Sequence, residues 1–144
     1  MIRSLTPQDL NTVMQIWLEG NLEAHAFIPE AYWKSNVPLV RDQLQSAEVW
    51  VYEKNEALLG FAGMQGDYLA GIFVKKEARS MGIGRELLTH LKELHPALTL
   101  HVYEKNHRAV DFYRREGFVI AAEELDSGTG ERELSMIWKI GEGK

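Results

Sequence analysis

Two glycines, Gly82 and Gly84, mark the stretch of this sequence whose chemistry is easiest to infer. They belong to Arg79-Ser-Met-Gly82-Ile-Gly84, which follows an apolar run at residues 68–74 and precedes a helical pattern of apolar residues. A helix that opens directly from a glycine turn directs free backbone N–H groups, and the positive end of its dipole, at one point. A missing Cβ also lets a ligand come close to the main chain. The turn therefore predicts an anion-binding site, and a phosphate is the anion that fits it best.

The elements that position this turn follow from the spacing of apolar residues. The predicted order is strand, helix, helix, three strands, helix, strand, helix and two strands, at residues 1–4, 6–20, 29–46, 49–53, 57–64, 68–74, 82–94, 99–103, 107–115, 118–124 and 131–140. Gly71, in the middle of a strand, suggests a bulge or a close backbone approach. The last four residues, 141–144, are expected to fray. This order indicates an α/β domain built around a mixed sheet.

Residues 20–40 carry features that bear on what else the site binds. Pro38 is expected to break the helix in this region into two pieces, because a proline inside a helix removes a hydrogen bond. Tyr32 and Trp33 are not both expected to be buried, so the segment forms either a lid or wall of the site or an ordinary packed helix. We expect the choice of the second substrate to lie here and around Tyr68.

Composition narrows the partners of the chain. Its 144 residues suit one domain, 1–144, and 45% hydrophobic and 26% charged residues are ordinary for a globular protein. A net charge of −5 disfavours nucleic acid, which needs a basic face. No apolar run approaches the roughly 20 residues that cross a bilayer, and the N-terminus lacks the apolar segment of a signal peptide, so we expect a cytoplasmic protein with no membrane partner. The absence of cysteine excludes disulfides and a cysteinyl intermediate, and no His, Asp or Glu group has metal-ligand spacing, so no metal is predicted.

Two motifs and the order of the elements resemble the GNAT (GCN5-related) N-acetyltransferase superfamily. Its acyl-CoA motif, a strand followed by Gln/Arg-x-x-Gly-x-Gly/Ala, corresponds to Ile72-Phe-Val74 and to the turn from Arg79 to Gly84. Its second motif, an Asn before a helix that carries Phe-Tyr and ends in Gly-Phe, corresponds to Asn106, Phe112-Tyr113 and Gly117-Phe118. The resemblance covers nearly the whole chain. It implies a mixed, mostly antiparallel sheet of about seven strands, flanked by helices, with splayed central strands.

The same resemblance implies that the chain binds acetyl-CoA as a cosubstrate. Phe73 and Val74 would offer N–H and C=O groups to the pantetheine arm as an added strand would, and a backbone N–H near them would face the thioester oxygen. Asn106 would contact the pantetheine arm or orient its loop. The pyrophosphate would lie on backbone N–H groups of the glycine turn and helix start, for which the implied residues are Arg79, Met81, Gly82, Ile83, Gly84 and Arg85.

Tyr113 and His101 are the residues expected to move protons. A phenol with a pKa of about 10 can give a proton or a hydrogen bond to the departing CoA thiolate, so Tyr113 is the predicted general acid. The alternative is that Tyr113 only packs on its helix while Phe112 lines the site. His101 is the predicted general base, directly or through water, because histidine titrates near neutrality and strand periodicity could point it into the splayed gap. Its alternatives are a solvated His101 without a catalytic role, and His25 as a base on the acceptor side.

These residues predict an acetyl-CoA-dependent N-acetyltransferase that acts on a primary amine by direct attack in a ternary complex. By resemblance, the acceptor is a protein lysine or an N-terminal amine. The alternatives are a small-molecule amine as acceptor and, in another class, a non-catalytic acyl-CoA-binding module. We expect the chain to act as a monomer or a weak homodimer.

Overall fold

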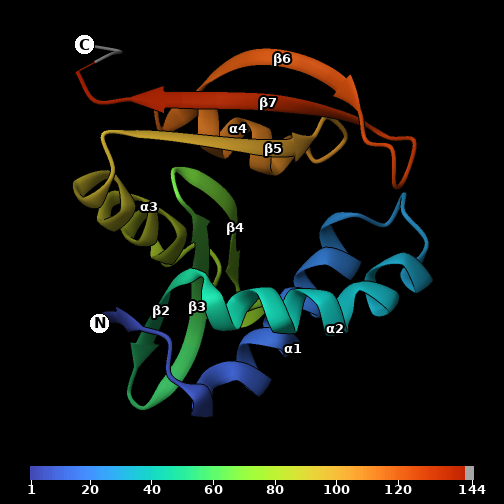
Figure 1. Cartoon of the computed structure of the whole chain (residues 1–144). Coiled ribbons are helices and arrows are strands. Elements are labelled where there is room, and N and C mark those ends of the chain that lie inside the picture. Colours follow the sequence, from blue (N-terminus) through green and yellow to red (C-terminus); the bar gives the residue numbers. More distant parts are fainter. Residues whose placement is uncertain (142–144) are drawn as a thin grey trace.

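The chain folds into a seven-stranded sheet with helices on both faces (Figure 1). The computed structural model describes residues 1–141. The strands are β1 Ile2–Ser4, β2 Glu48–Lys54, β3 Ala57–Gln65, β4 Tyr68–Val74, β5 Ala97–Tyr103, β6 Val119–Leu125 and β7 Arg132–Lys139. The α-helices are α1 Leu10–Ala24, α2 Glu30–Ser46, α3 Ile83–Leu94 and α4 His107–Arg115, with short 3-10 turns at Pro7–Asp9 (η1) and Lys76–Ala78 (η2). Residues 142–144, where fraying was expected, lie outside the described part of the chain.

The strands lie in the order β1-β2-β3-β4-β5-β7-β6, and every neighbouring pair is antiparallel except β4 and β5. The predicted α/β class, the element order and the mostly antiparallel sheet are therefore confirmed. None of the helices within residues 1–141 combines the length and apolar character that a bilayer crossing requires.

Each face of the sheet has its own hydrophobic core. One core packs the apolar stripe of α3, including Leu87, Leu88 and Leu91, with Tyr113 of α4 against the sheet. The other packs α1 and α2 against β2 and β3 on the opposite face. Side chains alternate between the two faces of β5, so the strand contributes to both cores. Leu98, Leu100 and Val102 are buried in the first core, and Tyr103 packs with the second. A strand with this pattern can present Thr99 and His101 on the α1 and α2 side.

The two central strands diverge, and this divergence opens the middle of the sheet. Their parallel register consists of Tyr68 opposite Thr99, after which β4 and β5 run apart (Figure 1). The register between β3 and β4 shifts beside Gly71, which leaves Ala70 without an opposite residue. The bulge expected near Gly71 is therefore present, and the predicted splay of the central strands is confirmed. The gap exposes backbone groups on one edge of β4.

The prediction that Pro38 splits its helical region was wrong, because α2 runs unbroken from Glu30 to Ser46. Pro38 is exposed, so the carbonyl that loses its helical partner can be solvated. Trp33 and Leu44 on the opposite side of α2 are buried in the α1 and α2 core, and this burial holds both halves of the helix in line. Tyr32 is half-buried beside the buried Trp33, in agreement with the expectation that the two are not both buried.

Candidate active site

The glycine turn presents unpaired backbone donors at the start of α3. Gly82 is the N-cap of α3 with φ of 78°, a left-handed conformation that favours glycine. Its carbonyl accepts the first helical bond, from the N–H of Glu86. The N–H groups of Ile83, Gly84 and Arg85 precede that bond and are free for a ligand, as they are at any helix start. Met81 beside them is exposed. The structure thus brings most of the predicted pyrophosphate residues together at one open corner.

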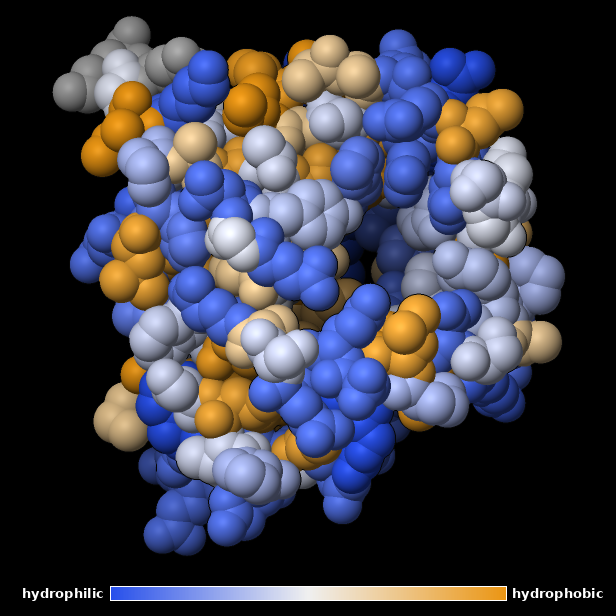
Figure 2. All heavy atoms as spheres, in the orientation of Figure 1, coloured by the Kyte–Doolittle hydropathy of each residue, from blue (hydrophilic) through white to orange (hydrophobic). Residues whose placement is uncertain are grey.

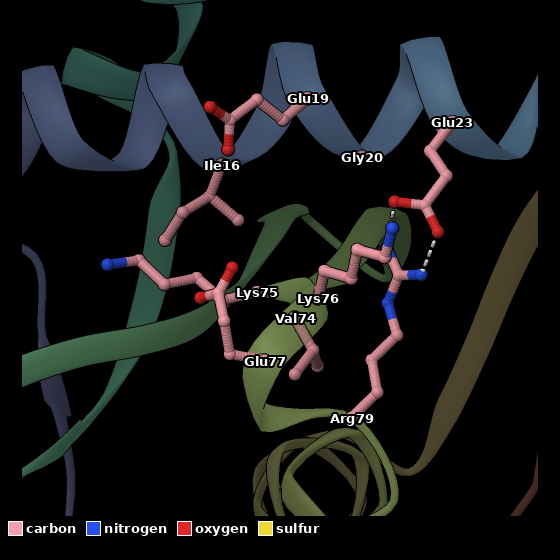
Figure 3. Close-up of a pocket in the computed structure, with 9 residues that line it drawn as sticks. All are labelled: Ile16, Glu19, Gly20, Glu23, Val74, Lys75, Lys76, Glu77 and Arg79. Carbon is pink, nitrogen blue, oxygen red and sulfur yellow. Dashed lines mark hydrogen bonds and ion pairs between the residues drawn. The ribbon is translucent and has the colours of Figure 1, made fainter.

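Arg79 lies in the same turn, but its side chain points toward α1. Its guanidinium forms a two-point ion pair with Glu23, whose pKa is lowered chiefly by this hydrogen bond (Figure 3). The pair lies at the edge of a cavity of about 240 Å³ between α1 and the loop after β4. Because the charge of Arg79 is already matched by a carboxylate, the groups of the turn that are available to an anion are its backbone N–H groups.

The hydrogen-bonding pattern between β4 and β3 determines which backbone groups of β4 face the gap. The N–H of Lys75 donates to the carbonyl of Leu59 on β3 at 2.8 Å. In an antiparallel pair, hydrogen-bonded residues alternate, so Phe73 directs its amide groups to β3 while Ile72 and Val74 direct theirs toward β5. This geometry narrows the predicted pantetheine contacts from Phe73 and Val74 to Val74, and it adds Ile72. The Phe73 ring stacks on Phe61 with centroids 5.2 Å apart.

Tyr113 reaches into the sheet from α4. It is 8% exposed and packs edge-on against Phe112 and Phe118. Burial, with a smaller contribution from the neighbouring Tyr68, raises its pKa above that of a free phenol. Phe112 is half-buried and approaches Gly84, so both aromatic residues contribute to this region.

His101 belongs to a chain of polar groups on the α1 and α2 face. The hydroxyl of Tyr68 lies 3.0 Å from Nδ1 of His101, and Nε2 of His101 lies 3.6 Å from Oε1 of Glu124 on β6. The Tyr68 O–H can donate to Nδ1 when the ring hydrogen of His101 is on Nε2, the nitrogen that lies on the side of Glu124. The His101 side chain is 37% exposed. The region around Tyr68 was expected to bear on the choice of the second substrate, but its contact with His101 was not predicted. Glu124 was not predicted as a site residue. Both contacts depend on strand pairing between distant segments.

Three carboxylates surround His101 on this face. Burial raises the pKa of Glu133, as do its neighbours Asp126 and Glu124, while His101 opposes them. Asp126, at the start of the β6–β7 turn, accepts a hydrogen bond from the Tyr103 hydroxyl at 2.6 Å. Figure 2 shows a hollow in the molecular surface between the upper strands and the helices below them. We call the three carboxylates Glu124, Asp126 and Glu133 the acidic wall. A group of negative charges of this kind favours the binding of a positively charged ligand.

Asn106 and His25 connect the two faces of the site. The side-chain carbonyl of Asn106 accepts from the N–H of Ala109 and caps α4, as the prediction that it orients its loop requires. Its amide nitrogen lies 3.1 Å from Nε2 of His25. Burial lowers the pKa of His25 to about 4, and its Nδ1 is bonded to Asn21. An imidazole with both nitrogens engaged and a low pKa is a poor proton acceptor, which argues against His25 as the base.

Comparisons with known proteins agree with this arrangement. Residues 45–120 match a family model described as an acetyltransferase (GNAT) domain. The chain is 42% identical over 122 residues to the peptidyl-lysine N-acetyltransferase YiaC of Escherichia coli, which covers 83% of this chain and 84% of that protein. It is 31% identical over 139 residues to the peptidyl-lysine N-acetyltransferase YjaB of Escherichia coli, covering 96% of this chain and 89% of that protein. The solution structure of apo YjaB from Escherichia coli superposes with a TM-score of 0.85 at 28% identity over 96% of each chain.

Within residues 1–141, no group of three or more His, Asp or Glu side chains is arranged to hold a metal ion.

Proposed function

This chain belongs to the GNAT acetyltransferase family, and from that membership we propose that it transfers the acetyl group of acetyl-CoA to lysine side chains of proteins. The observation that carries the proposal is the open gap between β4 and β5, with Tyr113 on one side and the Tyr68–His101 pair on the other. YiaC and YjaB, the relatives of the small bacterial type that the sequence resembles, are both named peptidyl-lysine N-acetyltransferases.

Acetyl-CoA would occupy the gap as an extra strand beside β4. Its pyrophosphate would accept hydrogen bonds from the free N–H groups at the start of α3, where the helix dipole adds to the attraction. Its pantetheine amides would pair with the backbone of Ile72 and Val74, whose groups face the gap. Ala70, which has no register partner at the bulge, lies near the end of this path, where a backbone N–H would stabilise the charge that develops on the thioester oxygen.

The transfer would proceed by direct attack. The neutral amine nitrogen of the acceptor bonds to the thioester carbonyl carbon, the carbon–sulfur bond breaks, and CoA leaves as a thiolate. The nitrogen, which becomes positively charged when it forms this bond, releases its second proton to water, and a neutral amide results. Tyr113 donates a hydrogen bond to that sulfur. Because the pKa of Tyr113 is raised while a thiol has a pKa of about 8.5, the phenol keeps most of its proton, and its role is to stabilise the thiolate.

The acceptor loses its proton through Tyr68 and His101. A lysine amine with a pKa of about 10.4 arrives as an ammonium ion. The Tyr68 hydroxyl can take that proton while it passes its own to Nδ1 of His101, across their 3.0 Å contact. Glu124 then faces the imidazolium ion and offsets its charge. The acidic wall formed with Glu133 attracts the ammonium ion before the proton leaves.

All of these groups come from a single chain, so we propose that a monomer is active, with at most weak dimerisation. Size-exclusion chromatography with light scattering would test this state. We also place the reaction in the cytoplasm, where acetyl-CoA is formed.

A thiol-release screen tests the proposed function. The purified protein and acetyl-CoA are incubated with lysine peptides blocked at the N-terminus, with lysine-free peptides that have a free N-terminus, and with small amines. We expect CoA release with the blocked lysine peptides. Release confined to small amines or to free N-termini would contradict the assignment of lysine as the acceptor. If no amine leads to CoA release and calorimetry detects no binding of acetyl-CoA, the protein is not an acetyltransferase that uses acetyl-CoA.

A further inference from the structure

His25 is a half-buried imidazole that takes no part in the transfer proposed above. It is the C-cap of α1 and lies beside Asn106, the N-cap of α4. Its ring stacks on Trp33 with centroids 5.2 Å apart, and the edge of Tyr103 meets it at 5.1 Å. Aromatic packing alone would be served equally well by phenylalanine at this position. The polar atoms of the ring therefore need a separate explanation.

Each ring nitrogen of His25 has one defined partner. Nδ1 lies 3.0 Å from Oδ1 of Asn21, and Nε2 lies 3.1 Å from Nδ2 of Asn106. The other end of each amide is also engaged. Asn21 donates from Nδ2 to the carbonyl of Trp17 at 2.9 Å, and Asn106 accepts at Oδ1 from the N–H of Ala109. These outer bonds fix the orientation of both amides.

The orientation of the amides selects one form of the ring. Asn21 presents an oxygen, which can only accept, so Nδ1 must carry the hydrogen. Asn106 presents an NH₂ group, which donates, so Nε2 must offer its lone pair. Asn21 is 3% exposed, and a buried amide is costly unless its groups are paired. Both ends of the Asn21 amide have a partner, and the network as a whole fits only neutral His25 in the Nδ1–H tautomer.

We propose that His25, in this tautomer, is a positioning residue that ties the end of α1 to Asn106 and thereby sets the placement of α4. Asn106 caps α4, and Tyr113 lies about two turns further along the same helix. The link joins the α1 and α2 layer, next to the acceptor hollow, to the helix that stabilises the departing thiolate. The catalytic consequence rests on the proposed function of Tyr113, whereas the link itself does not.

Three variants separate the hydrogen bonds from the packing. His25→Phe keeps an aromatic ring but removes both bonds. Asn106→Asp keeps an acceptor for the N–H of Ala109, and so keeps the cap, but it replaces the donor to His25 with a second acceptor. Phe27→Leu serves as the control, because it removes an aromatic contact of His25 at 5.7 Å and leaves the hydrogen-bonded chain intact.

The ¹⁵N NMR spectrum of the His25 ring tests the tautomer without any assay of activity. At neutral pH the wild-type ring should show a protonated Nδ1 and an unprotonated Nε2, and in Asn106→Asp a proton should appear on Nε2. For His25→Phe we expect kcat to fall about tenfold with the KM for acetyl-CoA within twofold of wild type. The amides of the first turns of α4 should also exchange faster with deuterium. Phe27→Leu should keep the wild-type ring spectrum and turnover.

A wild-type ring protonated on Nε2 would overturn the proposed tautomer. Turnover within twofold of wild type in His25→Phe, with unchanged exchange along α4, would overturn the positioning role. If the wild-type protein transfers acetyl to no amine, the proposed function fails, and the ring spectrum and the exchange rates still decide whether the link between α1 and α4 exists.

Discussion

Replacing His101 by glutamine should slow acetyl transfer by an amount that depends on the acceptor. The exchange removes the proton acceptor that lies 3.0 Å from the Tyr68 hydroxyl and keeps a polar side chain of similar reach. At pH 7.4 about 0.1% of lysine amines are neutral, given a pKa of about 10.4, so an enzyme that must wait for them loses up to about 1,000-fold in kcat/KM. This value lies within the range of about 10² to 10⁴ typical of general acid–base catalysis.

An acceptor with an α-amine gives a much smaller predicted loss. With a pKa of about 8, roughly 20% of it is neutral at the same pH, so the loss is limited to about fivefold. The assay follows CoA release from pH 6.5 to 9.5 with a blocked lysine peptide and with a lysine-free peptide that has a free N-terminus. For His101→Gln and the lysine peptide, log kcat/KM should rise by about one per pH unit, because the neutral amine becomes the reactant.

Tyr68→Phe should reproduce most of this loss, because it interrupts the same path. The double variant should be little slower than either single variant, since residues that act as a unit are not additive. A loss of less than threefold in His101→Gln, equal for both peptides and with an unchanged pH profile, would refute the proton path through Tyr68 and His101.

Three further predictions concern the thiolate, the acidic wall and the stability of the fold. Tyr113→Phe should lower kcat by about 10²-fold with acetyl-CoA affinity within threefold by calorimetry; unchanged turnover would remove its role toward the thiolate. Glu133→Gln should raise the KM of a basic lysine peptide about threefold, while Glu123→Gln, on the other face of β6, should not; equal effects would mean that the wall does not select charge. The pKa of Asp9 is lowered to about 2 by its hydrogen bonds, of which the one from Arg3 contributes most. Asp9→Asn should therefore lower the unfolding free energy by about 2 kcal/mol at pH 7. The Asp9 carboxylate stabilises the fold above its unfolded pKa and loses this effect as the pH falls toward 2. In urea melts, the difference in unfolding free energy between the wild type and Asp9→Asn should therefore shrink as the pH falls; a difference that stays constant with pH would contradict the stabilising role of the carboxylate.

Local patterns in the sequence were sufficient to predict the backbone elements that form the proposed donor side of the site. The glycine turn, Asn106 and Tyr113 each belong to a short motif in which the residue type and spacing carry the geometry. A left-handed N-cap at Gly82 and a side-chain cap at Asn106 are properties of a few consecutive residues. The strand boundaries near the turn follow for the same reason, and β4 begins and ends at the predicted residues.

The acceptor side could not be predicted in the same way. The contact between Tyr68 and His101 joins residues on two strands that are neighbours only in the folded sheet, and Glu124 reaches His101 across β7. No spacing in the sequence encodes these distances. The prediction for Pro38 failed for a related reason, since the packing of α2 on its core outweighed a local helix-breaking preference.

The central claim is that the ε-amine of lysine receives the acetyl group of acetyl-CoA. The most direct test uses a single peptide with one lysine and a free N-terminus, incubated with the protein and acetyl-CoA labelled with ¹³C in the acetyl group, followed by fragment mass spectrometry. The label should lie on the lysine side chain, with the N-terminal amine unmodified at early times. A label found only on the N-terminal amine, or no label on the peptide while CoA is released with small amines, would contradict the claim.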